Sequence, residues 1–228
     1  MNQISTRAWT QSSFSHGIGI RVTWVVMIGI LALLVLTGAA WVPAEQSPTE
    51  SVRSTIAEVI LVLDNEELKQ PGRSEERRRR IEQILKHHIS YGHMAQYSLG
   101  AAWAGLSGTE RQEFVGLFVE LLRDVFANRI TDYSGEQIVY LSEQREGSWA
   151  TVGTRLVGGK VNTAIDFRLV DRSGDWLVYD AVVDGVSIVN NYRAQFAGIV
   201  RDRSYTGLLN KMKQNTLIVK AFEKTAMR

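Results

Sequence analysis

Apolar residues after position 50 recur at intervals of three and four, which is the spacing of one buried face of an α-helix. The first such run begins at Val52 and stops near Pro71-Gly72. Ser74 is a good N-cap residue, so we expect it to begin a second helix with apolar positions at Ile81, Ile84, Leu85 and Ile89. A third helical stretch covers 93–103. This part of the chain is therefore predicted to be helical.

The clearest helix follows a capping box. Ser107 and Glu110 have the three-residue spacing that lets each side chain bond the backbone N–H of the other residue. The apolar positions of the helix then follow the 3.6-residue period: Phe114, Leu117, Phe118, Leu121, Leu122, Val125 and Phe126. A helix this apolar needs an equally apolar surface to pack against.

Four strands joined by short turns are predicted to supply that surface. The predicted strands are 137–141, 150–157, 162–170 and 176–183. The two clearest turns are Gly158-Gly159 and 171–174. In the last strand we expect Trp176, Val178 and Val182 to share one face, with further apolar residues on the other. A strand that is apolar on both sides must be covered on both faces.

Helical spacing returns after Gly185, and Ser187 is expected to cap that last helix. The sequence thus predicts an α+β fold in which a twisted antiparallel four-stranded sheet packs against several helices around an apolar cavity. We assign residues 45–214 to this domain and residues 215–228 to a C-terminal tail.

Residues 1–44 differ from the rest of the chain. They contain Arg7 and Arg21, no acidic residue, and no charged residue from Val22 to Ala44. A basic leader, an apolar middle and a small-residue end are typical of a secretory signal peptide, with cleavage expected after Ala44. The uncharged run is also close to the ~20 residues that span a bilayer, so a permanent N-terminal anchor is the alternative. Both interpretations place residues 45–228 outside the cytoplasmic membrane.

Composition narrows the classes of function. The chain has 228 residues, of which 45% are apolar, enough to build a folded core. Lys and Arg number 26 against 24 Asp and Glu, and no long basic stripe occurs, so nucleic acid is not expected as a partner. The absence of cysteine excludes disulfides, thiolate metal sites and cysteine nucleophiles.

No pattern of catalytic or metal-ligating residues emerges. His87, His88 and His93 lack the spacing of metal ligands, so we expect no metal and no cofactor. Asp180 and Asp184 are explained by ion pairing or by capping of backbone donors at a strand-to-helix corner. We therefore assign no catalytic residue and expect the protein not to be an enzyme.

A run of four arginines, Arg77–Arg80, covers the first turns of the second predicted helix. The simpler interpretation is a solvated helix face, paired in part with Glu75, Glu76 and Glu82. The alternative is a patch that docks a partner or a lipid headgroup.

Several segments occur in the order typical of one known family. They are His93–Trp103 followed by Leu106-Ser107 and 110–114, then 133–136, and finally Trp176–Val189 followed by 192–196. In these segments, within roughly residues 50–214, the chain resembles the MlaC family of periplasmic phospholipid-binding proteins. The family includes toluene-tolerance and hopanoid-associated branches, which the sequence does not separate.

The resemblance implies a periplasmic carrier that shuttles phospholipid between an outer-membrane lipoprotein complex and an inner-membrane ABC transporter complex. A hopanoid or other hydrophobic ligand, or less readily a lipid-acting enzyme on the same scaffold, is the alternative. The candidate lipid-binding residues come from the apolar layer: Leu117, Leu121, Val125, Ile165, Phe167, Leu169, Val178, Val182, Val186, Tyr192 and Phe196. Each could equally be plain core, because periodicity identifies a buried face without saying what covers it.

Overall fold

The computed structural model describes residues 46–131, 135–158 and 162–214. The predicted signal peptide or anchor, the predicted tail and Gly159 of the predicted Gly158-Gly159 turn lie outside these residues. Among the described residues, no helix is both long enough and apolar enough to cross a membrane.

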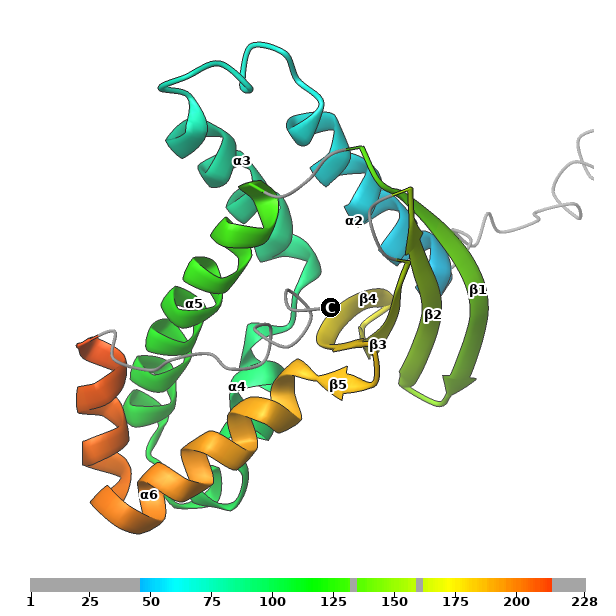
Figure 1. Cartoon of the computed structure of the whole chain (residues 1–228). Helices are drawn as coiled ribbons and strands as arrows, with labels where there is room; N and C mark the ends of the chain where they lie inside the picture. Colours follow the sequence, from blue (N-terminus) through cyan, green and yellow to red (C-terminus); the bar gives the residue numbers. More distant parts are fainter. Residues whose placement is uncertain (1–45, 132–134, 159–161, 215–228) are drawn as a thin grey trace, which may run out of the picture. The chain divides into compact units, whose positions relative to one another are not determined.

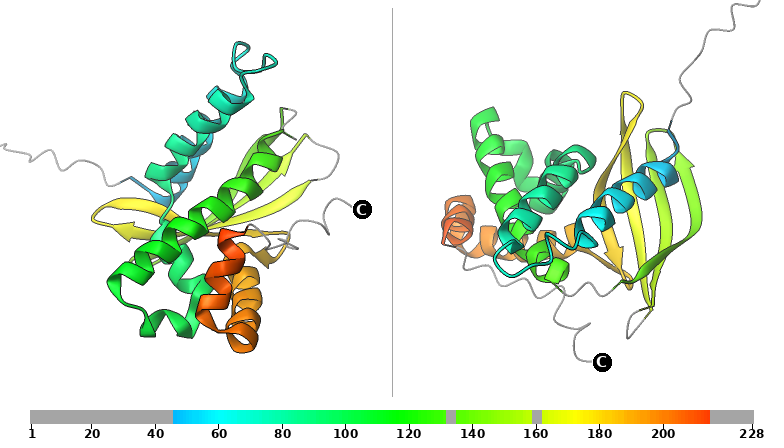
Figure 2. Two further views of the ribbon diagram at one scale, coloured as in Figure 1. Left: turned by 90° about the vertical axis from the view of Figure 1, so that its left-hand side faces the viewer. Right: turned by 90° about the horizontal axis from the view of Figure 1, so that it is seen from above.

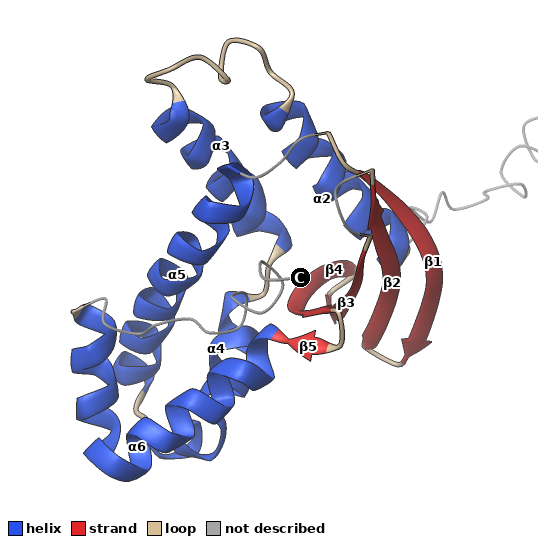
Figure 3. Ribbon diagram, viewed as in Figure 1, coloured by secondary structure: helices blue, strands red, loops and turns tan. Residues whose placement is uncertain are grey.

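Helices come first, strands next, and a helix with a kink at Ser204 last (Figure 1). The helices are α2 (Pro48–Leu63), α3 (Ser74–His88), α4 (Tyr91–Leu99), the 3-10 helix η1 (Gly100–Gly105), α5 (Gly108–Thr131) and α6 (Ile188–Lys213). The strands are β1 (Gln137–Glu146), β2 (Trp149–Val157), β3 (Thr163–Arg172), β4 (Asp175–Val183) and β5 (Val186–Ser187). Figure 3 shows the same division by colour. The α+β class is confirmed.

The strands form one antiparallel sheet in the order β1-β2-β3-β4-β5. It has five strands where the sequence predicted four, because the residues just before α6 pair briefly with the end of β4. The turn at 171–174 forms as expected, with the Gly174 N–H donating to Asp171 Oδ1 at 2.8 Å. Ser173 and Gly174 have φ of 59° and 95° there, a conformation that glycine adopts without strain.

Serine side chains cap the N-terminal ends of three helices. Ser107 Oγ accepts from the Glu110 N–H at 3.3 Å while Glu110 accepts from the Ser107 N–H at 2.8 Å, which confirms the predicted capping box. Ser187 Oγ accepts from the Asn190 N–H at 3.0 Å, as expected of an N-cap. Ser47 caps α2 in the same way.

The prediction that Ser74 caps α3 was wrong. Ser74 is the first residue of the helix, and the residue before it, Arg73, makes no side-chain cap bond. The reason is that the Arg73 carbonyl already accepts from the Arg77 N–H, so the helical hydrogen bonding begins one residue earlier than the sequence suggested.

The described domain has two clusters of buried apolar side chains. One joins α4, α5 and α6 and contains Phe114, Phe118, Tyr192 and Phe196. We call it the helical core. The other lies between α2 and the sheet and contains Val52 and Trp176 among others. We call it the sheet core, and Figure 2 shows α2 lying along the sheet.

Candidate functional site

The helical core takes up three of the predicted lipid-binding residues. Leu121, Tyr192 and Phe196 are buried there, and Leu117 packs against them. Phe118 meets Tyr192 edge to face with ring centroids 5.4 Å apart, a favourable aromatic geometry. These side chains are covered by protein. The Val125 side chain lies outside the described part of the chain.

The sheet core takes up a second group. Leu169 is fully buried there, and Phe167 and Val178 are partly buried against it. Ile165 is also half-buried on β3. Of the predicted residues, these half-buried ones on β3 and β4 are therefore better placed to meet a ligand than the buried aromatics of the helical core.

A β-bulge separates two residues that the sequence placed on one face of the last strand. Val178 lies opposite Leu169, whereas Val182 lies opposite Asp166 across the same pair of strands. Leu169 and Asp166 are three positions apart, so they point to opposite faces of the sheet. The expectation that Val178 and Val182 share a face was wrong, because the register shifts between Arg168 and Leu169.

Two more predicted residues lie at the corner that leads into α6. Val182 is buried and pairs with Ser187 of β5, while Val186 is 51% exposed. The predicted residues are thus divided between two cores and this corner. Contact of any of them with lipid stays a prediction.

A cavity of about 440 Å³ lies between α3 and α5, in a place that the sequence did not indicate. Its volume is within the ~300–1,000 Å³ typical of pockets for small ligands. We call it the α3–α5 cavity. Its lining residues are Arg78, Arg79, Ile81, Glu82, Gln83, Leu85, Lys86, Tyr91, Val119, Leu122 and Arg123.

The lining is apolar in part and basic in part. Ile81 and Leu85 of α3 face Val119 and Leu122 of α5 across the cavity and supply an aliphatic wall. The charged lining residues are four basic side chains and one acidic side chain, Glu82. A ligand that suits this cavity carries both an alkyl part and a negative charge.

Acidic neighbours hold much of the arginine run in place. Arg78 donates to Glu75 at 2.7 Å and lies 3.3 Å from Glu82. The Arg78 hydrogen bond holds the pKa of Glu75 below its usual value of 4.5. The predicted partial pairing of the arginine run with the nearby glutamates is confirmed for Arg78 at these contacts.

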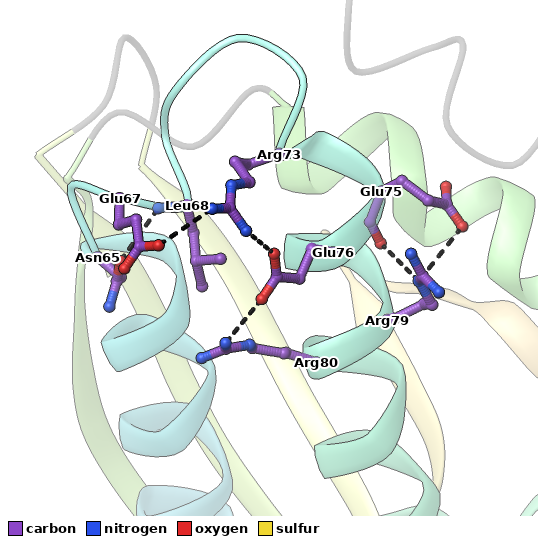
Figure 4. A network of polar contacts seen from close by, with 8 residues as sticks. All are labelled: Asn65, Glu67, Leu68, Arg73, Glu75, Glu76, Arg79 and Arg80. Carbon is purple, nitrogen blue, oxygen red and sulfur yellow. Dashed lines mark hydrogen bonds and ion pairs between the residues drawn. The ribbon is translucent and has the colours of Figure 1, made fainter.

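A second ion-pair network ties the start of α3 to the loop that precedes it (Figure 4). Arg73 contacts Glu76 at 2.6 Å and Glu67 at 3.3 Å, and Arg80 contacts Glu76 at 2.7 Å. The bonds from Arg73 and then Arg80 lower the pKa of Glu76. This network fixes the N-terminal end of α3 and so helps to keep the cavity wall in position.

The C-terminal end of α3 is attached to the sheet. Ile89, which follows α3 directly, forms a β-bridge with Val178, and the Ser90 N–H donates to the Val178 carbonyl at 2.8 Å. Tyr91 comes next and lines the cavity. Burial raises the pKa of its hydroxyl to about 12, so Tyr91 is neutral there at ordinary pH. The segment 89–91 therefore links the strand that carries Val178 to the lining of the cavity.

Asp180 serves the corner between β4 and α6. Its carboxylate is almost fully buried and accepts from the Ser187 hydroxyl at 2.6 Å, the Val189 N–H at 3.0 Å and Arg168 at 3.2 Å. These bonds occupy the carboxylate with capping and ion pairing, as the sequence suggested. Within the described ranges, no group of three or more His, Cys, Asp or Glu residues could hold a metal ion.

Only some of the residues that line the cavity were indicated by the sequence. Ile81 and Leu85 were recognised as apolar helix positions, and Arg78 and Arg79 as members of a possible headgroup patch. Val119 was missed because it lies off the main apolar face of α5, beside the buried Phe118. The signal that could have found Val119 is that α5 is partly apolar on two faces.

The fold and the cavity together define an α+β protein with an amphipathic, ligand-sized hollow between two helices. The model of the MlaC protein family matches residues 53–214, so the chain belongs to this family and the resemblance is confirmed.

This chain is similar to several known proteins. The intermembrane phospholipid transport system binding protein MlaC of Haemophilus influenzae is 29% identical over 123 residues, which cover 51% of this chain and 58% of that relative. The match thus spans less than two thirds of the relative's length. A phospholipid-binding protein from Ralstonia solanacearum, solved in complex with a phospholipid, has a similar fold with a TM-score of 0.66. It is 17% identical, over 72% of this chain and 93% of that one.

Proposed function

We propose that this protein binds phospholipid and carries it between membranes, as a binding protein and not as an enzyme. The observation that carries the proposal is the amphipathic α3–α5 cavity in a chain of the MlaC family. The names of the similar proteins from Haemophilus influenzae and Ralstonia solanacearum, which refer to phospholipid, support the same class of ligand.

The energetics of such a carrier are simple. Burial of each methylene is worth about 0.8 kcal/mol, so the tails of a two-chain lipid represent on the order of 25 kcal/mol of apolar burial. A bilayer offers nearly the same. A carrier that matches the membrane interior makes transfer close to neutral, and direction then comes from partners that bind the loaded and empty forms differently.

A two-chain phospholipid is larger than the ligands that a 440 Å³ cavity encloses completely. We therefore propose that the cavity holds part of the lipid and that the rest extends along half-buried apolar side chains of the sheet, such as Phe167 and Val178. The backbone bridge between Ile89 and Val178, which attaches the end of α3 to β4, supports this path.

The location and partners follow from the same proposal. Residues 1–44 act as a signal peptide or anchor that delivers residues 45–228 to the periplasm. There the carrier exchanges lipid with an inner-membrane ABC transporter complex and an outer-membrane lipoprotein complex.

Mass spectrometry of an organic extract of the purified exported protein tests the proposal. We expect phospholipid in stoichiometric amount. A hopanoid or another apolar compound in its place would assign the protein to the alternative ligand class. Chemical turnover of the bound lipid would indicate an enzyme, and an empty extract would contradict the carrier function.

A further inference from the structure

The apolar and basic side chains of α3 lie on different sides of the helix at the α3–α5 cavity. Ile81 and Leu85 are four residues apart and therefore stack on one line. Arg79 and Lys86 are seven apart, two helical turns, so they also stack on one line, more than a quarter turn from the first. The cavity thus has an aliphatic side and a cationic side.

The two cations differ from Arg78 in how they are held. Arg78 is engaged by two carboxylates, at 2.7 Å and 3.3 Å. The Arg79 guanidinium is 3.8 Å from Glu75, and its side chain is 66% exposed. Lys86 is also exposed. Both side chains therefore have room to turn toward a ligand at the mouth of the cavity.

We propose that Arg79 and Lys86 bind the phosphate of the lipid headgroup and make the carrier prefer headgroups with a net negative charge. This inference rests on the proposed function and adds a specificity to it. The alkyl part then lies against Ile81, Leu85 and Val119, and the phosphate stays at the solvent side, where two cations can donate charge-assisted hydrogen bonds to it.

The preference comes from the charges that remain around the phosphate. Glu82, the one carboxylate of the lining, is already paired with Arg78. A zwitterionic headgroup would bring an ammonium next to Arg79 and Lys86, where like charges repel. An uncharged polar headgroup on the same phosphate brings no such repulsion.

Competitive loading tests this specificity. The exported protein is stripped of lipid and incubated with vesicles that contain equal amounts of phosphatidylglycerol and phosphatidylethanolamine, and the bound lipids are quantified. We expect phosphatidylglycerol to be enriched. Arg79→Gln and Lys86→Gln should each lower the enrichment about threefold, the size of one partly exposed ion pair.

Arg80→Gln is the matched control. It removes the same charge from the same helix, but Arg80 pairs with Glu76 and does not line the cavity. We expect it to keep the wild-type enrichment. Unchanged thermal midpoints in all three variants would show that the comparison is between folded proteins.

The outcomes separate this inference from the proposed function. Stoichiometric lipid without phosphatidylglycerol enrichment, or equal enrichment in all variants, would overturn the inference while the carrier function stands. No bound lipid in the wild type would overturn both. Inorganic phosphate is also tested on the stripped protein. If it binds as tightly as phosphatidylglycerol does, the site recognises a free anion and the lipid assignment is wrong.

Discussion

Helix α5 separates two regions of very different character, the closed helical core and the open α3–α5 cavity. Toward α4 and α6 it presents Phe114 and Phe118, which are fully buried among other aromatic rings. Toward α3 it presents Val119 and Arg123 to a hollow. Leu122 belongs to both regions. An apolar helix face therefore indicates burial, and the element that packs opposite it decides whether side chains or a ligand fill the space.

Phe118→Ala should have the largest effect, and it should act on stability alone. It removes a fully buried ring that contacts Phe114, Tyr192 and Phe196, so we expect a loss of about 3–5 kcal/mol in the free energy of unfolding. Urea denaturation measures it. The molecules that remain folded should keep their lipid. A loss below about 1 kcal/mol would mean that the helical core is not closed.

Asp180→Ala should come next. It leaves the Ser187 hydroxyl and the Val189 N–H without their acceptor in a buried site, and we expect a loss of about 2–3 kcal/mol. Asp184→Ala is the matched control, because the Asp184 carboxylate is exposed and accepts from the Ala164 N–H, so about 1 kcal/mol or less is expected. Equal losses of unfolding free energy in both variants would mean that the Asp180 hydrogen bonds do not stabilise the corner between β4 and α6.

Leu85→Glu should affect the cavity more than the fold. Leu85 is half-buried on the aliphatic side, beside Lys86, so a carboxylate there can reach solvent and basic neighbours. We expect a loss of stability below about 1.5 kcal/mol and a large loss of bound lipid. Leu61→Glu, at a position 73% exposed on α2, should change neither quantity. Lipid retention in the Leu85 variant would remove the cavity from the binding site.

Val178→Glu and Phe167→Glu examine whether the sheet contributes to the same site. Both residues are partly buried against the sheet core, so we expect folded protein with less lipid. Circular dichroism and lipid quantification on the same samples separate the two effects. Unfolding of both variants would assign these residues to plain core.

The smallest expected effect is a pH dependence at the start of α3. Arg73 and Arg80 lower the pKa of Glu76, so the ionised form is favoured in the folded protein. The resulting stability is present above the unfolded pKa of about 4.5 and is lost as the pH falls through the lower folded value. We expect Arg73→Gln to destabilise slightly at pH 7, with the difference from wild type vanishing in acid. A difference that is constant with pH would contradict this origin.

Local signals in the sequence predicted much of the fold. The capping box at Ser107 and Glu110, the cap at Ser187 and the turn at 171–174 depend on residues a few positions apart, and they form as expected. The four long strands also follow from local alternation and turn residues.

Features that depend on distant contacts were less accessible. The bulge in β4 that separates Val178 from Val182 arises from pairing with β3, so no local pattern indicated it. The α3–α5 cavity brings Leu85 together with Val119, and only the packing of two helices decides that space remains between them. Helical periodicity identified Ile81 and Leu85 as buried positions, but it does not indicate which helix packs against them.

Photo-crosslinking with a phospholipid that carries a photoreactive group in its acyl chain tests whether the α3–α5 cavity holds the lipid. The exported protein is loaded, irradiated and digested, and the modified residues are mapped by mass spectrometry. We expect crosslinks on the aliphatic wall of the α3–α5 cavity, at Leu85 and Val119, and none at Phe118 in the helical core. Crosslinks confined to other surfaces, or absent altogether, would contradict this expectation.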